Sequence, residues 1–201
     1  MASFEKSQKI VGINEGGYQS DPDDKGNWYK GILIGTNWGI AAPTLARFLG
    51  RIPSSTEMKT LSRATAELIL KRNYWETSHF DKLVNQSVAT LLYDGTVNHG
   101  VGGMRLLTEK ALKRLKKPFY KSKVFTEEGI ELLNKLNQKA LFETIKTVRT
   151  ESYKASAQKK YLKGWLNRLE RIKYVPETGS TNVLLGMLLF LLGIGLFFIG
   201  F

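Results

Sequence analysis

The sequence predicts a mainly α protein: a helical domain with one small β-hairpin near its N-terminus and a hydrophobic helix at its C-terminus. Three observations support this fold class. Apolar residues recur at helical spacing through most of residues 60–163. Aromatic and β-branched residues gather between Trp28 and Trp38. The stretch from Val183 to Phe201 carries no charge and is almost entirely apolar.

The elements follow from the periodicity and from turn residues taken in order. A first helix over 7–16 leads to Glu15 and ends at the pair Gly16-Gly17. Glycine, aspartate and proline then form turns, and the hairpin occupies 28–38. Further helices are predicted over 43–49, 60–74, 80–93, 104–115, 125–136 and 138–163.

The same pattern divides the chain into segments. We predict an N-terminal domain over 1–115, a helical region over 116–175, a short polar linker over 176–182 and a terminal helix over 183–201. A helix as long as the last segment reaches about 28 Å, close to the hydrocarbon thickness of a bilayer. The sequence therefore predicts a membrane span there, although the positive-inside rule would place the preceding basic region in the cytoplasm.

Glycine recurs every seven residues through this tail, at Gly179, Gly186, Gly193 and Gly200. A smooth stripe for packing between membrane helices accounts for the spacing. The general frequency of glycine in membrane helices accounts for it equally well.

The charge balance is strongly basic, with 30 lysines and arginines against 18 acidic residues and a net charge of +12. Such a surface favours polyanionic partners, including anionic lipid and cell-wall polymer. No nucleic-acid reading module is recognised, so we expect no specific nucleic acid. The absence of cysteine excludes disulfides and thiolate chemistry. The polar N-terminus lacks the apolar core of a secretory signal peptide.

The most informative segment places Glu15 ahead of a turn that holds Asp21, Asp23 and Asp24. Glycoside hydrolysis needs a carboxylic acid that protonates the leaving oxygen and usually a second carboxylate. A glutamate half-buried beside aromatic rings would have its pKa raised by desolvation, as a general acid requires. From spacing alone the simpler interpretation, a solvated helix end followed by turn-forming aspartates, is favoured.

Metal sites are weakly supported. Asp21, Asp23 and Gly26 occupy the first, third and sixth places of an EF-hand, but Lys25 and Ile32 stand where ligands are needed. The two histidines have no ligand-type spacing. We expect no metal and no cofactor.

Several ordered motifs shift the balance towards catalysis. They are Glu15-Gly16-Gly17-Tyr18 with Asp21-Pro22 and Asp24, then Gly39-Ile40, Arg72-Asn73-Tyr74-Trp75, and Tyr93-Asp94-Gly95-Thr96-Val97-Asn98-His99-Gly100. Together they resemble the signature of glycoside hydrolase family 108, the lysozyme-like N-acetylmuramidases. Residues 125–169, with Lys163-Gly164-Trp165-Leu166-Asn167-Arg168 as the closest piece, resemble the peptidoglycan-binding region that accompanies this domain. The run from Asp24 to Asn27 and an insertion over 28–35 depart from the family pattern.

The resemblance implies a lysozyme-like α+β fold with Glu15 as the catalytic acid. The order Glu15, Asp24 and Thr36 is also similar to that of phage-type lysozymes. By that analogy Asp24 holds water or stabilises positive charge, and Thr36 orients the water. Asp21 and Asp23 remain rivals for the second carboxylate.

Substrate contacts are predicted at five further positions. Aromatic rings stack on pyranose faces, which makes Tyr18, Trp38 and Tyr74 candidates for the sugar groove, although core packing is commoner for aromatic residues. Trp75 is expected in the core. Asp94 and Asn98 are one helical turn apart and share a face. The resemblance suggests that this face contacts the groove, and the alternative is a capping or buttressing role.

The resemblance implies hydrolysis of the β-1,4 bond between N-acetylmuramic acid and N-acetylglucosamine in peptidoglycan. Residues 1–115 would form the muramidase domain and 116–175 the binding region, acting at the bacterial wall while the tail associates with a membrane. The expected role is wall lysis by a phage or a secretion or injection-type system, with possible particle proteins or further copies of the chain as partners. Two alternatives are a non-catalytic, membrane-anchored peptidoglycan-binding protein and a protein that permeabilises membranes through its tail.

Overall fold

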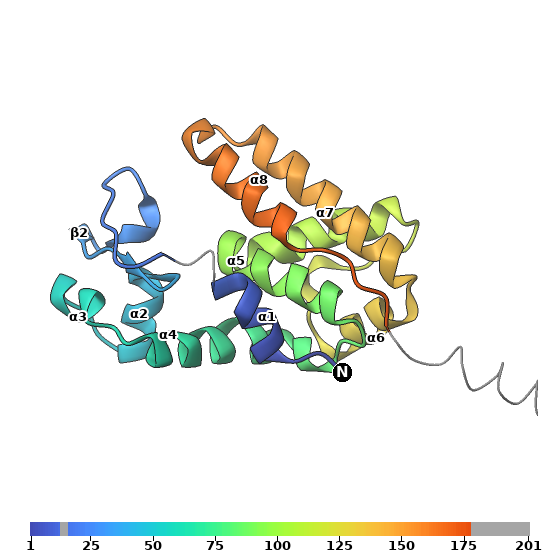
Figure 1. The fold of residues 1–201 in the computed structure, drawn as a ribbon, viewed down its shortest axis with the longest axis horizontal. Helices are drawn as coiled ribbons and strands as arrows, with labels where there is room; N and C mark the ends of the chain where they lie inside the picture. Colours follow the sequence, from blue (N-terminus) through green and yellow to red (C-terminus); the bar gives the residue numbers. More distant parts are fainter. Residues whose placement is uncertain (13–15, 178–201) are drawn as a thin grey trace, which may run out of the picture.

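A computed structural model of the protein describes residues 1–12 and 16–177 and is predominantly helical (Figure 1). The short strands gather with short helices at one end of the molecule, and the longer helices pack together at the other end. The α-helices are α1 (Phe4–Val11), α2 (Ala42–Leu49), α3 (Ser55–Lys59), α4 (Arg63–Leu70), α5 (Gln86–Arg114), α6 (Glu127–Lys135), α7 (Gln138–Ala155) and α8 (Leu162–Arg171). Single turns connect them: η2 (Lys25–Asn27), η4 (Glu76–Ser78), η5 (Phe80–Lys82), η6 (Lys121–Lys123) and η7 (Lys159–Tyr161) are 3-10 helices, and η3 (Lys71–Trp75) is a π-helix.

The first helix begins earlier than the sequence predicts. Ser3 caps α1 by accepting a hydrogen bond from the Lys6 amide, the α-helix runs to Val11, and residues 13–15 of the predicted range lie outside the described residues. A serine at the cap position satisfies a backbone amide that has no partner within the helix, which fixes the start.

Two short hairpins form where one was predicted. Strand β1 (Trp28–Tyr29) pairs with β2 (Ile32–Leu33), and β3 (Thr36–Asn37) pairs with β4 (Ile40–Ala41), both antiparallel. Each connection has two residues with positive φ, Lys30-Gly31 in the first hairpin and Trp38-Gly39 in the second. Two-residue turns of this type match the twist of the flanking strands, which explains two tight hairpins instead of one long one.

The longest helix joins two predicted helices. The chain over 80–93 starts with the 3-10 turn η5, and α5 begins only at Gln86, where the Asn85 side chain caps the amides of Ser87 and Val88. The second predicted helix, 104–115, is the far half of α5, beyond a kink at Gly100 with φ of 70° and ψ of 160°. Positive φ favours glycine, so this residue permits the change of direction.

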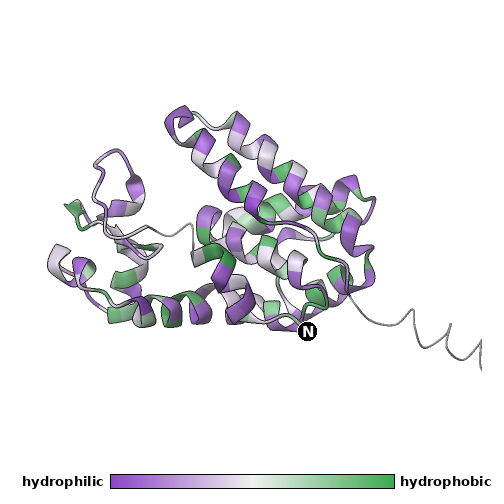
Figure 2. Cartoon of the chain, in the orientation of Figure 1, coloured by the Kyte–Doolittle hydropathy of each residue, from purple (hydrophilic) through white to green (hydrophobic). Residues whose placement is uncertain are grey.

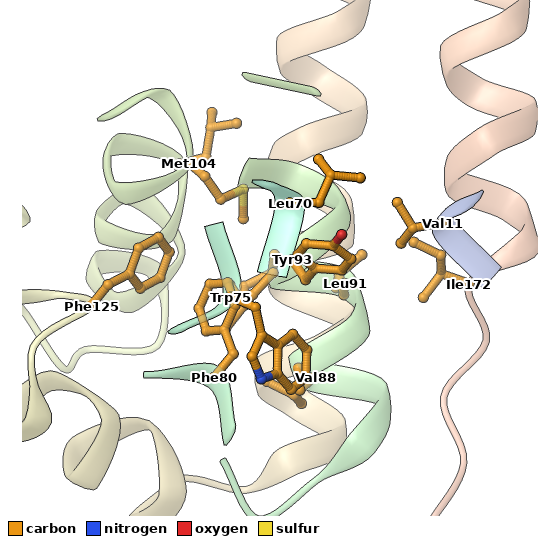
Figure 3. Close-up of a cluster of buried hydrophobic side chains, with 14 of the residues drawn as sticks. Val11, Leu70, Trp75, Phe80, Val88, Leu91, Tyr93, Met104, Phe125 and Ile172 are labelled. Carbon is orange, nitrogen blue, oxygen red and sulfur yellow. The ribbon is translucent and has the colours of Figure 1, made fainter. Parts of the chain in front are cut away.

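The hydrophobic core is built around aromatic side chains from the middle of the chain (Figure 3). Trp75 is 2% exposed and makes edge-to-face contacts with Phe4, Phe80 and Tyr93. The predicted core position of Trp75 is therefore confirmed. These rings join α1, η3, η5 and α5, and such aromatic pairs add stability beyond the area that they bury.

The core continues without a break from residues 1–115 into 116–175. Helix α7 packs along α5, and its buried face joins the same cluster through Leu141, Phe142, Ile145 and Val148. In Figure 2 the helices carry alternating hydrophilic and hydrophobic bands, as expected of helices with one buried face. The C-terminal region thus shares its interior with the N-terminal one.

The helix predicted over 138–163 ends at Ala155 instead. Ser156 is extended, η7 reverses the chain, and α8 returns beside α7 in the opposite direction (Figure 1). Residues 172–177 then run back to the start of α5, where the Val175 amide donates to the Ser87 hydroxyl at 2.9 Å.

The predicted membrane helix over 183–201 and most of the linker over 176–182 lie outside the described residues. Among the helices in the described part of the chain, none combines the length and the apolar character needed to cross a bilayer.

Candidate active site

Residues 19–27, the acidic loop, are organised around the side chain of Gln19. Its amide oxygen accepts hydrogen bonds from the Asp21 amide at 2.9 Å and from the buried Asn27 side chain at 2.8 Å. Its amide nitrogen donates to Asp24 Oδ2 and to Asn27 Oδ1, both at 3.1 Å. One glutamine thus connects the start, the middle and the end of the loop.

Asp24 is held by neutral donors within this loop. Its Oδ1 accepts a hydrogen bond from the Gly26 amide at 2.9 Å, which caps η2, and its Oδ2 accepts the Gln19 bond. The side chain is half-buried. Each carboxylate oxygen has two lone pairs, so a carboxylate fixed in this way keeps the capacity to accept from a water molecule or to face a cationic sugar.

Asp21 and Asp23 face a different part of the molecule. Tyr161 donates to Asp21 Oδ2 at 2.9 Å, while Lys160 Nζ lies 3.3 Å from that oxygen and 2.9 Å from Asp23 Oδ2. The Asp23 amide donates to Asp21 Oδ1 at 2.9 Å. The pKa of Asp21 is lowered, first by this backbone hydrogen bond and then by the Tyr161 hydroxyl and Lys160, so Asp21 is ionised at neutral pH.

Thr36 lies beside the acidic loop because its backbone pairs with that of Gln19. The Gln19 amide donates to the Thr36 carbonyl at 2.9 Å, and the Thr36 amide donates to the Gln19 carbonyl at 2.8 Å. The structure therefore brings Asp24 and Thr36 into one hydrogen-bonded unit through Gln19. Glu15, the predicted general acid, lies outside the described residues.

The three predicted groove aromatics are half-buried, and their polar atoms all bond within the protein. Tyr18 donates to the Ile34 carbonyl at 3.2 Å, and the Trp38 indole donates to the Leu61 carbonyl at 3.0 Å. The Tyr74 hydroxyl lies 3.2 Å from that of Thr44. These bonds fix the rings, and substrate contact by Tyr18, Trp38 and Tyr74 stays a prediction.

The structure contradicts the predicted substrate contact of Asp94. Its side chain is fully buried, and its two oxygens accept from Arg149 Nη2 and Arg168 Nε, each at 2.7 Å. The burial raises its pKa, but the coulombic effects of Arg168 and Arg149 outweigh it, so the pKa is lowered overall. Asp94 therefore buttresses the packing of α5 against α7 and α8, which is the alternative role weighed from the sequence.

Asn98 points towards the same interface. Its Oδ1 accepts a hydrogen bond from the Tyr153 hydroxyl at 2.9 Å, and Tyr153 in turn accepts from Arg149 at 2.8 Å. The Tyr153 ring stacks on His99 on one side and on Trp165 on the other. Asn98 is half-buried, and its contact with substrate stays a prediction.

Three residues that shape this region were not predicted from the sequence: Arg149, Lys160 and Tyr161. Arg149 stands within the apolar pattern of α7, and a charged residue at such a position indicates a buried partner. No local signal marks Lys160 and Tyr161, because their partners precede them by more than half of the chain. Among the described residues no group of three or more His, Asp or Glu side chains could hold a metal ion.

Comparisons with known proteins give one family match and one similar solved structure. The family model described as glycosyl hydrolase 108 matches residues 8–100, which include the acidic loop, both hairpins and the first half of α5. The solved structure of Brucella abortus SagA is similar, with a TM-score of 0.71 and 25% sequence identity over 84% of this chain and 90% of that one. A search of curated proteins gives no match.

The match to the glycosyl hydrolase 108 model supports the assignment of the chain as a glycoside hydrolase. A match to this family further implies a peptidoglycan hydrolase of the N-acetylmuramidase type.

Proposed function

We propose that the protein cleaves the β-1,4 bond between N-acetylmuramic acid and N-acetylglucosamine, with Glu15 as general acid. Asp24 is the second carboxylate and Thr36 orients the attacking water. The single observation that carries the proposal is the unit formed by Gln19, which bonds to Asp24 through its side chain and to Thr36 through its backbone. Gln19 lies four positions after Glu15 in the sequence, and the unit lies within the matched family region.

The proposed reaction begins when Glu15 protonates the glycosidic oxygen and the bond to the sugar breaks. Positive charge then develops on the sugar ring, and the Asp24 side chain stabilises it or activates a water molecule. Asp24 suits this role better than Asp21 and Asp23, because those two carboxylates form ion pairs with Lys160. The anomeric configuration of the product distinguishes a direct attack by Asp24 from water attack assisted by Asp24.

The test is a clearing assay on purified peptidoglycan with the full chain and single variants. Because removal of a general acid typically costs about 10²–10⁴-fold in rate, we expect Glu15→Gln to lose nearly all clearing. Asp24→Asn should lose most of it, and Thr36→Val should show an intermediate loss. The matched control is Asp81→Asn, an exposed aspartate on η5.

Three outcomes separate this proposal from its alternatives. Equal clearing by wild type and Glu15→Gln would remove Glu15 from catalysis. No clearing by wild type, with retained binding to the wall polymer, would favour the non-catalytic peptidoglycan-binding protein. Lysis of cells by the peptide 179–201 alone would favour permeabilisation by the tail.

We also propose that the apolar sequence from Val183 to Phe201 associates the enzyme with a membrane, and that the role is wall lysis by a phage or injection-type system. The support is the uncharged composition of that stretch, whose length suits a bilayer. Co-sedimentation with liposomes tests the first part: the full chain should sediment, and a chain ending at residue 178 should remain in solution.

A further inference from the structure

The acidic loop, near the N-terminus, is contacted by residues near the C-terminal end of the described chain. Lys160 and Tyr161 in η7 bond to Asp21 and Asp23, and these contacts join residues that are 137 to 140 positions apart. Two donors, the Tyr161 hydroxyl and the Lys160 ammonium, converge on the single oxygen Oδ2 of Asp21. This contact links the predicted binding region to the part of the chain that carries the predicted catalytic carboxylate.

We propose that Lys160 and Tyr161 are positioning residues that hold the acidic loop in the geometry that presents Asp24 to the substrate. The region 116–175 then completes the active site, in addition to any affinity that it has for the wall. This inference rests on the proposed function, because it takes Asp24 as the second carboxylate.

Hydrogen bonds within the acidic loop connect Asp21 to Asp24. The Asp21 carbonyl accepts from the Asp24 amide at 3.1 Å and from the Asn27 side chain at 2.8 Å. The Asp21 amide donates to Gln19, which also holds Asp24 Oδ2. A displacement of Asp21 therefore shifts both the backbone and the carboxylate of Asp24.

The donors themselves are anchored to the helical core. The Tyr161 ring lies 5.8 Å from that of Trp165, which stacks on Tyr153 at 5.3 Å, and Tyr153 stacks on His99 at 4.8 Å. This row of rings runs from η7 through α8 and α7 to α5. The buried bonds of Asp94 to Arg149 and Arg168 hold the same three helices together. The acidic loop is thus tied to α5, the longest helix of the fold.

The expected effect is on catalytic geometry more than on global stability. The side chains of Lys160, Asp21 and Asp23 are each partly exposed, and exposed ion pairs contribute little to folding stability. A displacement of catalytic groups by about 1 Å can nevertheless cost about 10²-fold in rate.

The experiment uses the full chain with soluble peptidoglycan fragments, so that attachment to an insoluble wall does not limit the rate. The test variant combines Lys160→Met and Tyr161→Phe, which removes both donors and keeps the aromatic ring. We expect kcat to fall about tenfold or more with little change in KM, since positioning acts on the transition state. Lys160→Arg should retain most of the activity because it keeps a cation in place. Lys154→Met, which removes an exposed lysine from the last turn of α7, is the control.

A second measurement does not depend on activity. Hydrogen exchange of the amides in 19–27 should accelerate in the double variant, while the core of α5 should exchange as in the wild type. Unchanged kcat in the double variant overturns the inference, and so does unchanged exchange in the loop. Full activity of Glu15→Gln, by contrast, overturns the proposed function and leaves the exchange result to decide the positioning role of Lys160 and Tyr161.

Discussion

Asp94 on α5 and Arg149 on α7 form an ion pair 2.7 Å long in which neither side chain is exposed to solvent. Removing two charges from water is costly, and further hydrogen bonds to both side chains offset part of that cost. Arg168 supplies one of these to Asp94, and the carbonyl of Leu91 accepts another from Arg149 at 2.9 Å. The pair fixes how the C-terminal helices sit on α5.

Replacing Asp94 should therefore destabilise the whole fold. Asp94→Asn leaves the buried Arg149 and the largely covered Arg168 without their counter-charge, and breaking a buried pair in this way costs about 3–5 kcal/mol. Urea unfolding followed by circular dichroism measures the loss. Glu170→Gln is the control, because Glu170 pairs with lysines at the surface and should cost no more than about 1 kcal/mol. Equal losses in the two variants would contradict the stabilising role of the Asp94–Arg149 pair.

The stability should also depend on pH through His99. Burial, reinforced by Arg149, lowers the pKa of His99 from 6.5 to about 4. In the unfolded chain His99 takes up a proton below pH 6.5, whereas in the folded chain it stays neutral until about pH 4. The free energy of unfolding therefore keeps the full contribution of neutral His99 above pH 6.5. It loses about 2–3 kcal/mol of that contribution as the pH falls towards 4.

His99→Phe tests this dependence, because phenylalanine keeps a ring against Tyr153 and removes the titratable group. Unfolding free energies measured at several values between pH 4 and 6.5 should decline less steeply in the variant than in the wild type. Parallel slopes for the two proteins would assign the pH dependence to other groups.

Gly35 should be essential for the position of the acidic loop. It has a φ of +99°, and a Cβ there would lie 2.5 Å from the Tyr18 ring and 2.7 Å from the Gln19 carbonyl. Gly35→Ala must therefore displace the segment that pairs with Thr36, and we expect a large loss of clearing activity. Gly31→Ala is the matched control, since its φ is +78° but nothing lies within 4 Å of the added carbon. It should cost only the strain of positive φ, about 1 kcal/mol. Similar activities in the two variants would refute the packing argument.

Trp75 should be the most sensitive position of the aromatic core. Trp75→Leu removes edge-to-face contacts with three rings and leaves a cavity among α1, η3, η5 and α5. Large-to-small changes of this kind cost about 3–5 kcal/mol. Thermal unfolding compares it with Trp28→Leu, a change at a ring that is 37% exposed. A smaller effect at Trp75 than at Trp28 would be incompatible with the packing described.

The sequence predicted the local elements well where short-range chemistry decides them. The residue pattern predicted the helix at 43–49, the general preference of aromatic residues for the core predicted the position of Trp75, and the aromatic run at 28–38 marked the hairpin region. It failed where distant contacts decide. Nothing in the chain around Ala155 forbids a longer helix, and the reversal there places Trp165 against Tyr153.

Asp94 illustrates the limit for the candidate site. Its spacing from Asn98 correctly indicated a shared helix face, but that face meets Arg149, which lies 55 positions later in the chain. The sequence by itself determined the acidic motif, the helical class and the family resemblance, because these depend on residue types at fixed local spacing. Only the tertiary structure decided that Asp94 is an internal counter-ion and that η7 bonds to the acidic loop. Periodicity reports which residues share a surface, whereas the identity of what packs against that surface depends on how the whole chain folds.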